Sequence, residues 1–384
     1  MTEIVLPGAD GRLTPYTMGE PVAWRRPDAP FRSRIAYAAA HVVADPLADN
    51  TPGRPAALDW DATMRIRRHL WSYGLRVADA MDTAQRNMGL DWAAATELIR
   101  RSAEAARDFG DPAELLACGA GTDHAPQAAT LDEVIAAYEE QIETVEATGA
   151  RVIVMASRQL AAVARGPEDY HRVYGRLLAQ TARPVILHWL GEMFDPALAG
   201  YWGAADLERA TESFLALVRD HAPRIDGVKV SLLDADHEVR LRAALPEGVR
   251  LYTGDDFNYD RLIASGSDAL LGIFDAIAPA ASAALATLDA GDETAYDKAF
   301  APTVPLSRHI FQTPTYHYKT GITFLAWLAG LQDAFVMVNG AHSARSVPYL
   351  AEIFRLADQA GLLPDPDLAA SRMRTLLATA GVTR

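Results

Sequence analysis

The chain has 384 residues, of which 50% are hydrophobic and 22% are charged, a composition typical of a globular protein with a large core. Its formal net charge of −14 argues against a protein that works by attracting the phosphate backbone of nucleic acids, and it suits an enzyme of small molecules. Cys118 is the only cysteine, which excludes an internal disulfide and a cysteine metal cluster.

The sequence predicts neither export nor insertion into a membrane. The first twelve residues lack the basic and then apolar run of a signal peptide. The longest uncharged apolar stretch, residues 276–288, contains a proline and is too short to cross a bilayer. We therefore expect a cytoplasmic protein that does not bind membranes.

Apolar runs of strand length alternate with longer amphipathic segments along most of the chain. The expected strands lie within residues 34–45, 75–82, 115–120, 151–156, 184–189, 226–231, 249–254 and 269–274. The expected helices between them are residues 61–73, 91–109, 130–149, 167–181 and 205–221, a short helix from 236, and 259–264. This alternation of helices with Val-, Ile- and Leu-rich strands predicts an α/β fold, a (β/α)8 TIM barrel of parallel strands.

We expect three parts along the chain. Residues 1–30 are rich in proline and arginine and should form an arm or a small hairpin. Residues 31–284 should form the barrel, and residues 285–384, which show only helical periodicity, should form a helical extension packed on it.

Lysine is rare in this chain: only Lys229, Lys298 and Lys319 occur, whereas thirty-three of the 36 basic residues are arginine. Arginine stays protonated, but a desolvated lysine can act as an amine nucleophile. Lys229 stands in an expected strand between Val228 and Val230, so its side chain points opposite to both and into the barrel if they face the helices. Lys298 and Lys319 lie in helical segments and are expected to be structural.

Several short motifs occur in an order that resembles the dihydrodipicolinate synthase and N-acetylneuraminate lyase superfamily of class I aldolase-like barrels. They are Gly119-Ala-Gly121-Thr122, Gly227-Val-Lys229, Gly254-Asp-Asp256, the glycine-bounded eighth strand from Gly266 to Gly272, and Phe311-Gln-Thr-Pro314 followed by Lys319. The resemblance implies a lyase or aldolase without a cofactor, in which Lys229 forms a Schiff base with a small carbonyl substrate, a keto sugar or keto acid. It also implies a homodimer or homotetramer.

The chain departs from the family after the second strand, where it reads Met81-Asp82-Thr83. The family uses a pair of threonines here to hold a substrate carboxylate. Asp82 would repel such a group, whereas Thr83 can still donate a hydrogen bond. We expect a hydroxylated substrate at these two residues; the alternative is that Asp82 caps the following helix.

Other polar residues at strand ends are candidates for the site, because TIM-barrel enzymes act at this face. His188 ends the fifth strand and can relay protons in place of the family's catalytic tyrosine, while His124 follows the third strand. Ser157 and Arg158 end the fourth strand, and Arg158 can bind an anionic group. Asp255 and Asp256 follow the seventh strand, where they can bind a sugar hydroxyl or cap the next helix.

Two other functions remain open at this point. Asp82, His124, His188 and Asp255 can be the ligands of a metal-dependent barrel isomerase, epimerase or hydrolase. The chain can also be a barrel that binds a small molecule without catalysis. Lys229 favours the Schiff-base enzyme, for which no metal is expected.

Overall fold

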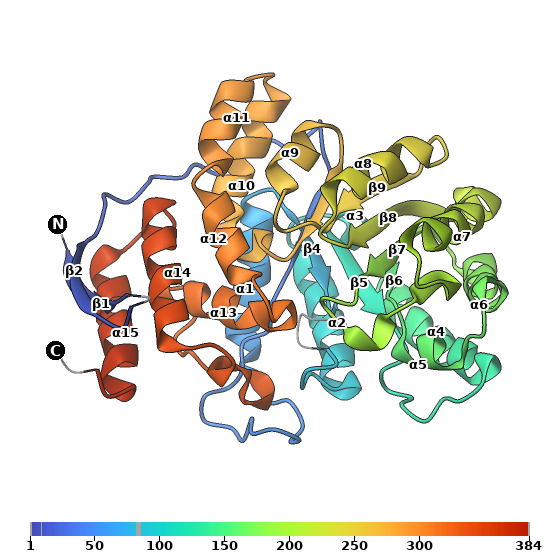
Figure 1. Ribbon diagram of the computed structural model, residues 1–384, viewed down its shortest axis with the longest axis horizontal. Helices are drawn as coiled ribbons and strands as arrows, with labels where there is room; N and C mark the ends of the chain where they lie inside the picture. Colours follow the sequence, from blue (N-terminus) through green and yellow to red (C-terminus); the bar gives the residue numbers. More distant parts are fainter. Residues whose placement is uncertain (1, 9, 82–85, 383–384) are drawn as a thin grey trace.

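The computed structural model describes residues 2–8, 10–81 and 86–382. Within them, eight parallel strands close into a barrel in the order β10-β3-β4-β5-β6-β7-β8-β9, with β9 paired to β10 (Figure 1). The barrel strands are β3 (Ala36–Ala39), β4 (Arg76–Asp79), β5 (Leu116–Ala120), β6 (Arg151–Val154), β7 (Val185–Leu190), β8 (Ile225–Ser231), β9 (Arg250–Thr253) and β10 (Asp268–Leu271). The predicted (β/α)8 barrel is confirmed, and each strand lies in or overlaps its predicted segment.

Helices surround this barrel, one or more after each strand. The helices from β3 to the segment after β10 are α1 (Trp60–Ser72), α2 (Trp92–Ala106), α3 (Pro112–Leu115), α4 (Leu131–Glu146), α5 (Arg158–Val163), α6 (Pro167–Gln180), α7 (Leu207–His221), α8 (Ala235–Ala244), α9 (Tyr259–Ala264) and α10 (Phe274–Asp289). Short 3-10 turns are η1 (Pro196–Leu198), η2 (Tyr201–Gly203) and η3 (Ala222–Arg224). The short helices α3 and α5 and the 3-10 turns were not predicted.

The sequence of α4 shows why such helices form and how they attach. Thr130 and Glu133 make a reciprocal capping box that satisfies free backbone N–H groups at its first turn. Val134, Tyr138 and Val145 are spaced to share one face, and this face is buried against the sheet. Helix position is therefore set by an apolar stripe, and helix start by a cap.

The barrel has two apolar layers, one inside it and one between the sheet and the helices. The interior cluster consists of Tyr37, Ala39, Ala78, Met81, Ala117, Ile153, Met155, Ile186, Tyr252 and Leu270. Alternate strand residues belong to the outer layer instead, for example Val228 and Val230. This period-two alternation identifies which side chains point into the barrel.

The C-terminal extension stands on one side of the barrel (Figure 1). It consists of α11 (Glu293–Phe300), α12 (Thr303–Ile310), η4 (Thr315–His317), α13 (Tyr318–Leu328), η5 (Val338–Ser343), α14 (Val347–Gln359) and α15 (Pro366–Thr379). The predicted barrel boundary at residue 284 falls inside α10, so the helix crosses from one proposed part into the next.

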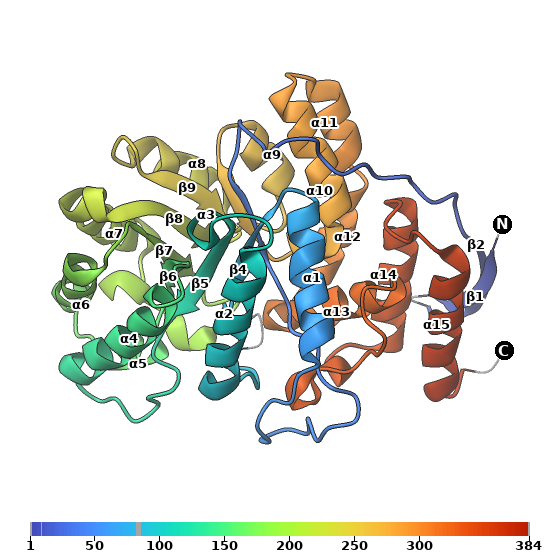
Figure 2. The same cartoon turned by 180° about the vertical axis from the view of Figure 1, so that it is seen from behind.

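The N-terminal segment begins with the antiparallel hairpin β1 (Glu3–Pro7) and β2 (Leu13–Thr17), which packs on the extension. The Tyr16 hydroxyl donates to Asp358 at 2.7 Å, which fixes the hairpin to the end of α14. An extended stretch then leads to the barrel (Figure 2). Within this stretch, the Trp24 indole donates to the Gly361 carbonyl at 2.8 Å. Both chain ends lie beside α15, away from the barrel.

None of the helices in the described ranges has the length and apolar character needed to cross a membrane.

The contact between α8 and the barrel contains a buried carboxyl that should make stability depend on pH. Glu238 accepts hydrogen bonds from the hydroxyls of Thr253 and Ser267, both at 2.9 Å. Burial raises the pKa of Glu238 to about 8, although both hydroxyls oppose the rise. In the unfolded chain the carboxyl ionises near its usual pKa. The buried, protonated form therefore contributes fully to the free energy of unfolding below that pKa, and this contribution is lost as the pH rises through about 8.

We therefore expect the free energy of unfolding of Glu238→Gln, which cannot ionise at this position, to rise relative to that of the unmodified protein by on the order of 3 kcal/mol between pH 5 and pH 9. Urea unfolding across this pH range measures the difference, with Glu143→Gln on the exposed face of α4 as the control. Parallel pH profiles for the unmodified protein and Glu238→Gln would contradict the prediction.

Candidate active site

Lys229 lies inside the barrel, on β8. It stands opposite His188 of β7 and Tyr252 of β9 in the strand register. Opposed residues of parallel strands point to the same face of the sheet, and Tyr252 belongs to the interior cluster. His188 is two residues after Ile186, another member of that cluster. Lys229 and His188 therefore both point into the barrel, where Lys229 is 7% exposed and His188 fully buried.

The next layer toward the C-terminal ends of the strands is formed by Leu190, Ser231 and Gly254. Leu190 and Ser231 are opposed in the register, and the Ser231 hydroxyl lies 3.3 Å from Nε2 of His188. A methyl group on Gly254 would lie 2.2 Å from this hydroxyl and 3.1 Å from Cε of Lys229. A side chain at residue 254 would clash with Ser231 and crowd the lysine, whose Cε reaches the level of this upper layer.

Asp256 is a buried carboxyl near the same end of the barrel. One of its oxygens accepts from the Ile273 amide at 2.8 Å, and its backbone carbonyl accepts from Ser307. Burial raises the pKa of Asp256 to about 7, although the amide of Ile273 and the positive charges of Lys229 and Lys319 oppose the rise. This carboxyl can thus bind or release a proton near neutral pH.

A second buried lysine, Lys319 of α13, closes a polar network over the end of β3. Its amine donates to the Ala39 carbonyl and, at 2.9 Å, to Asp275, which is also 2.9 Å from Nδ1 of His41. Burial lowers the pKa of Lys319, against the opposing effect of Asp275. Burial also opposes ionisation of Asp275, yet His41 and Lys319 hold its pKa well below its usual range. Lys319 is thus buried and charge-paired, and its structural role stays a prediction.

Three of the predicted binding residues make local contacts that hold the structure. Both side-chain oxygens of Asp255 accept hydrogen bonds from the turn at Phe257 and Asn258. Ser157 accepts from the Leu160 amide as the N-cap of α5. The ring nitrogens of His124 lie 2.8 Å from Gln141 and 3.2 Å from Glu140, both on α4. Their roles in substrate binding remain predictions.

Arg86 organises the loop after β4 and was not predicted. Its buried guanidinium donates to the carbonyls of Ala80 and Gly119, at 3.2 and 2.9 Å, and is ion-paired with Asp123. It also lies 5.1 Å from the centre of the Trp92 ring. An arginine in a polar loop resembles a solvated side chain in the sequence, so no local signal could have identified it.

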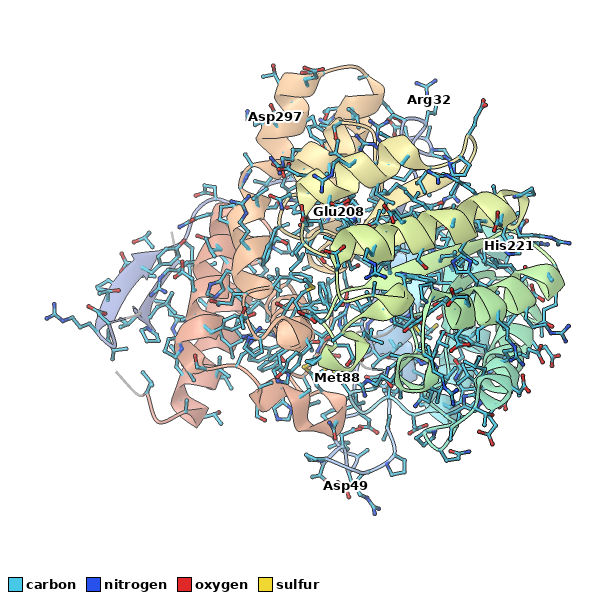
Figure 3. All side chains as sticks on the ribbon, turned by 45° about the vertical axis from the view of Figure 1, so that its right-hand side comes forward. Arg32, Asp49, Met88, Glu208, His221 and Asp297 are labelled. Atoms are coloured by element: carbon cyan, nitrogen blue, oxygen red, sulfur yellow. The ribbon has the colours of Figure 1, made fainter. Side chains whose placement is uncertain are left out.

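A pocket of about 300 Å³ opens at the C-terminal ends of the strands, and we call it the mouth pocket. It is lined by residues 86–88, Arg158, Leu190, residues 194–196 and Tyr316. Leu190 belongs to the layer directly above His188 and Lys229, so the pocket stands over the buried lysine. Figure 3 labels Met88, one of the lining residues, where barrel loops approach the C-terminal helices.

Arg158, the predicted anion-binding residue, does line the mouth pocket. Its Nε donates to Asp195 at 2.6 Å, and its side chain is 42% exposed. Phe194 and Tyr316 line the same pocket, but neither was predicted as a site residue. Phe194 follows β7, and Tyr316 lies in η4. Asp82 and Thr83 lie outside the described residues, so their predicted roles have no structural test.

Comparisons with other proteins agree with this architecture. A family model described as "protein of unknown function (DUF993)" matches residues 4–382. A search of the curated proteins gave no significant match.

Solved structures of the dihydrodipicolinate synthase family share the fold at low sequence identity. A dihydrodipicolinate synthetase-type protein from Pseudomonas aeruginosa has 17% identity and a TM-score of 0.65, covering 85% of this chain and 99% of its own. The enzyme from Acinetobacter baumannii, solved with pyruvate, has 17% identity and a TM-score of 0.63, covering 86% and 100%. A prophage protein of the family from E. coli K12, also with pyruvate, has 16% identity and a TM-score of 0.65, covering 86% and 99%. The resemblance seen in the sequence is confirmed at the level of the fold.

The network around Lys319 should be essential for stability. Removing one member of a buried ion pair leaves the other charge without compensation. We expect Lys319→Met to lower the free energy of unfolding by about 3 kcal/mol. The added change Asp275→Asn should restore part of this loss, because it removes the carboxylate that Lys319 compensates. Urea unfolding of the single and double variants measures both effects. A loss below about 1 kcal/mol for Lys319→Met would refute this role.

Proposed function

The chain belongs to the DUF993 family, and we propose that it is a Schiff-base-forming lyase or aldolase that acts on a small carbonyl compound through Lys229. The observation that carries the proposal is the position of this lysine. Its amine lies inside the barrel, beneath the mouth pocket, with His188 opposite and a glycine that makes room for it. The neutral amine is the nucleophilic form of lysine.

The proposed reaction begins when the neutral amine of Lys229 attacks the substrate carbonyl carbon. The carbinolamine that forms loses its oxygen as water and becomes an imine, so the carbonyl oxygen leaves with two protons. The protonated imine then accepts the electron pair of the bond between its α- and β-carbons while the hydroxyl on the β-carbon loses its proton, so that this carbon leaves as a second carbonyl compound. Alternatively, it accepts the electron pair of a C–H bond at the α-carbon, whose proton is removed. Protonation and hydrolysis of the resulting enamine or imine release the product and restore Lys229.

His188 and Ser231 are proposed to move the protons of these steps. The 3.3 Å contact between Nε2 of His188 and the Ser231 hydroxyl allows a proton to pass along the layer that faces the amine. Asp256 is buried and can titrate near neutral pH. We propose that it accepts a hydrogen bond from a substrate hydroxyl or holds a proton during the reaction. Arg158 is proposed as a substrate contact because it lines the mouth pocket.

The contacts favour this proposal over a metal-dependent reaction. His124 has partners at both ring nitrogens, and both carboxylate oxygens of Asp255 are used in a turn. Two of the four ligands suggested for a metal are thereby engaged elsewhere. In the described parts of the chain, no three His, Cys, Asp or Glu side chains gather as a metal site.

We also propose a homodimer or homotetramer in the cytoplasm. The oligomer is supported by the resemblance to the dihydrodipicolinate synthase superfamily alone. The cytoplasmic location is supported by the acidic composition and by a single cysteine, Cys118, which is buried as a free thiol.

Substitution of Lys229 tests the covalent step. After incubation with dihydroxyacetone or pyruvate and reduction with borohydride, we expect the unmodified protein to gain the mass of one ligand less one oxygen, and Lys229→Met to gain none. Lys298→Met is the matched control, because it removes an exposed lysine of α11 and should leave the adduct unchanged. Equal labelling of the Lys229→Met variant would refute the proposal.

Substitution of His188 separates imine formation from later proton transfer. We expect His188→Gln still to form the reduced adduct, because Lys229 remains. Without borohydride, exchange with D2O of the ligand protons next to the carbonyl should slow by roughly a hundredfold or more, since general acid–base groups contribute this much. NMR of the ligand measures the exchange. If His188→Gln exchanges protons at the unmodified rate, the relay is wrong; if the unmodified protein forms an adduct but exchanges none, the non-catalytic barrel is favoured.

A further inference from the structure

We infer that the mouth pocket holds the part of the substrate remote from its carbonyl, and that this part is an uncharged hydroxylated chain, so that the substrate is a neutral keto sugar. This inference rests on the proposed function of Lys229 and narrows its substrate from carbonyl compounds in general to one chemical class.

The position of the pocket determines which part of the substrate it can hold. Leu190 lines it, and the same residue is opposed to Ser231 in the layer above His188 and Lys229. Cε of Lys229 reaches Gly254 in that layer, so the amine lies near the level of Leu190 at the bottom of the pocket. This arrangement places the remaining carbon chain of a carbonyl bound to the amine in the mouth pocket.

The charges of the pocket wall are balanced within the described residues. The guanidinium of Arg158 is paired with Asp195 at 2.6 Å, and that of Arg86 is paired with Asp123. A carboxylate bound to the other N–H groups of Arg158 would lie close to Asp195, and the two like charges would repel each other. The wall thus offers little net positive charge to an anion.

A hydroxyl group, in contrast, can use both members of the Arg158–Asp195 pair. It can donate its proton to the carboxylate and accept a hydrogen bond from the guanidinium, which has five N–H donors. Only the Nε–H of Arg158 is used in the bond to Asp195, and the side chain is 42% exposed. Successive hydroxyls along a carbon chain fit this alternation of donor and acceptor.

Apart from Asn87, the rest of the pocket wall is largely apolar and fits the C–H groups of such a chain. Met88, Leu190, Phe194 and Tyr316 provide it. Tyr316 comes from the C-terminal extension, where the neighbouring Tyr318 stacks on Phe311 at 4.3 Å and meets the edge of Phe194 at 6.4 Å. These ring contacts hold the segment of Tyr316 in place, so the extension provides one wall of the pocket.

The test compares borohydride-trapped adducts by intact mass and measures the concentration of each compound that gives half-maximal trapping. Dihydroxyacetone and hydroxypyruvate form a matched pair, since both are hydroxylated three-carbon carbonyls and only the second carries a carboxylate. Erythrulose and xylulose extend dihydroxyacetone by one and two hydroxylated carbons. We expect the half-maximal concentration of hydroxypyruvate to be about ten times higher than that of dihydroxyacetone, and that of xylulose about ten times lower.

Variants of the pocket connect this preference to its residues. Arg158→Met and Tyr316→Ala should each raise the half-maximal concentration of xylulose by about tenfold, and that of dihydroxyacetone by less, because the shorter ligand contacts fewer residues of the pocket. Phe109→Ala, which removes an exposed aromatic ring after α2, should change neither. Thermal unfolding shows whether each variant is folded, and Tyr316→Phe provides a milder change at the same position.

The outcomes separate this inference from the proposed function. Two results with labelled Lys229 would overturn the keto-sugar inference and leave the Schiff base intact. One is a half-maximal concentration of hydroxypyruvate equal to or below that of dihydroxyacetone. The other is an unchanged half-maximal concentration of xylulose in the pocket variants. Failure of every compound to label Lys229 overturns both.

Discussion

A lysine inside a closed barrel loses most of its contact with water, and an ammonium group without that contact is costly unless other charges compensate it. The placement of Lys229 imposes this constraint on the upper part of the barrel. Gly254 gives space to its side chain, and Ser231 and His188 share its face of the sheet. The amine is thereby directed toward the single end of the barrel at which TIM-barrel enzymes react with their substrates.

Two of the three lysines are buried, and their surroundings differ in kind. Lys319 is enclosed by the Ala39 carbonyl and Asp275, which in turn contacts His41, so it connects the C-terminal extension to the first barrel strand. Lys229 lies on the barrel strand itself, beneath a pocket. Asp256 lies within electrostatic reach of both lysines, so the charge of Lys319 affects a carboxyl that also feels Lys229.

The sequence was sufficient to predict the barrel and the interior position of Lys229, because both depend on local periodicity. Alternation along 225–231 determines that Lys229 points opposite to Val228 and Val230, and both valines do belong to the outer apolar layer. The network of Lys319 depends instead on residues 280 positions apart in the chain, which no local pattern reports. The same holds for Tyr316, whose part in the mouth pocket follows from how the extension packs on the barrel.

The roles of strand-end residues were harder to predict because a polar side chain there can bind a ligand or end a strand equally well. Asp255 and Ser157 make the contacts of turn and cap residues, while Arg158 does reach the mouth pocket. Only tertiary partners distinguish these cases. The sequence therefore predicted the face of the barrel and the interior position of Lys229 better than the residues that line the mouth pocket.

The most direct test of the central claim is to locate the reduced adduct within the unmodified protein. The chain has only three lysines, so digestion with a protease that does not cut at lysine, followed by mass spectrometry, can examine each of them after treatment with dihydroxyacetone and borohydride. The account predicts the added mass on the peptide that contains Lys229 and on neither of the peptides with Lys298 and Lys319. Labelling of Lys298 or Lys319 with Lys229 unmodified would contradict it.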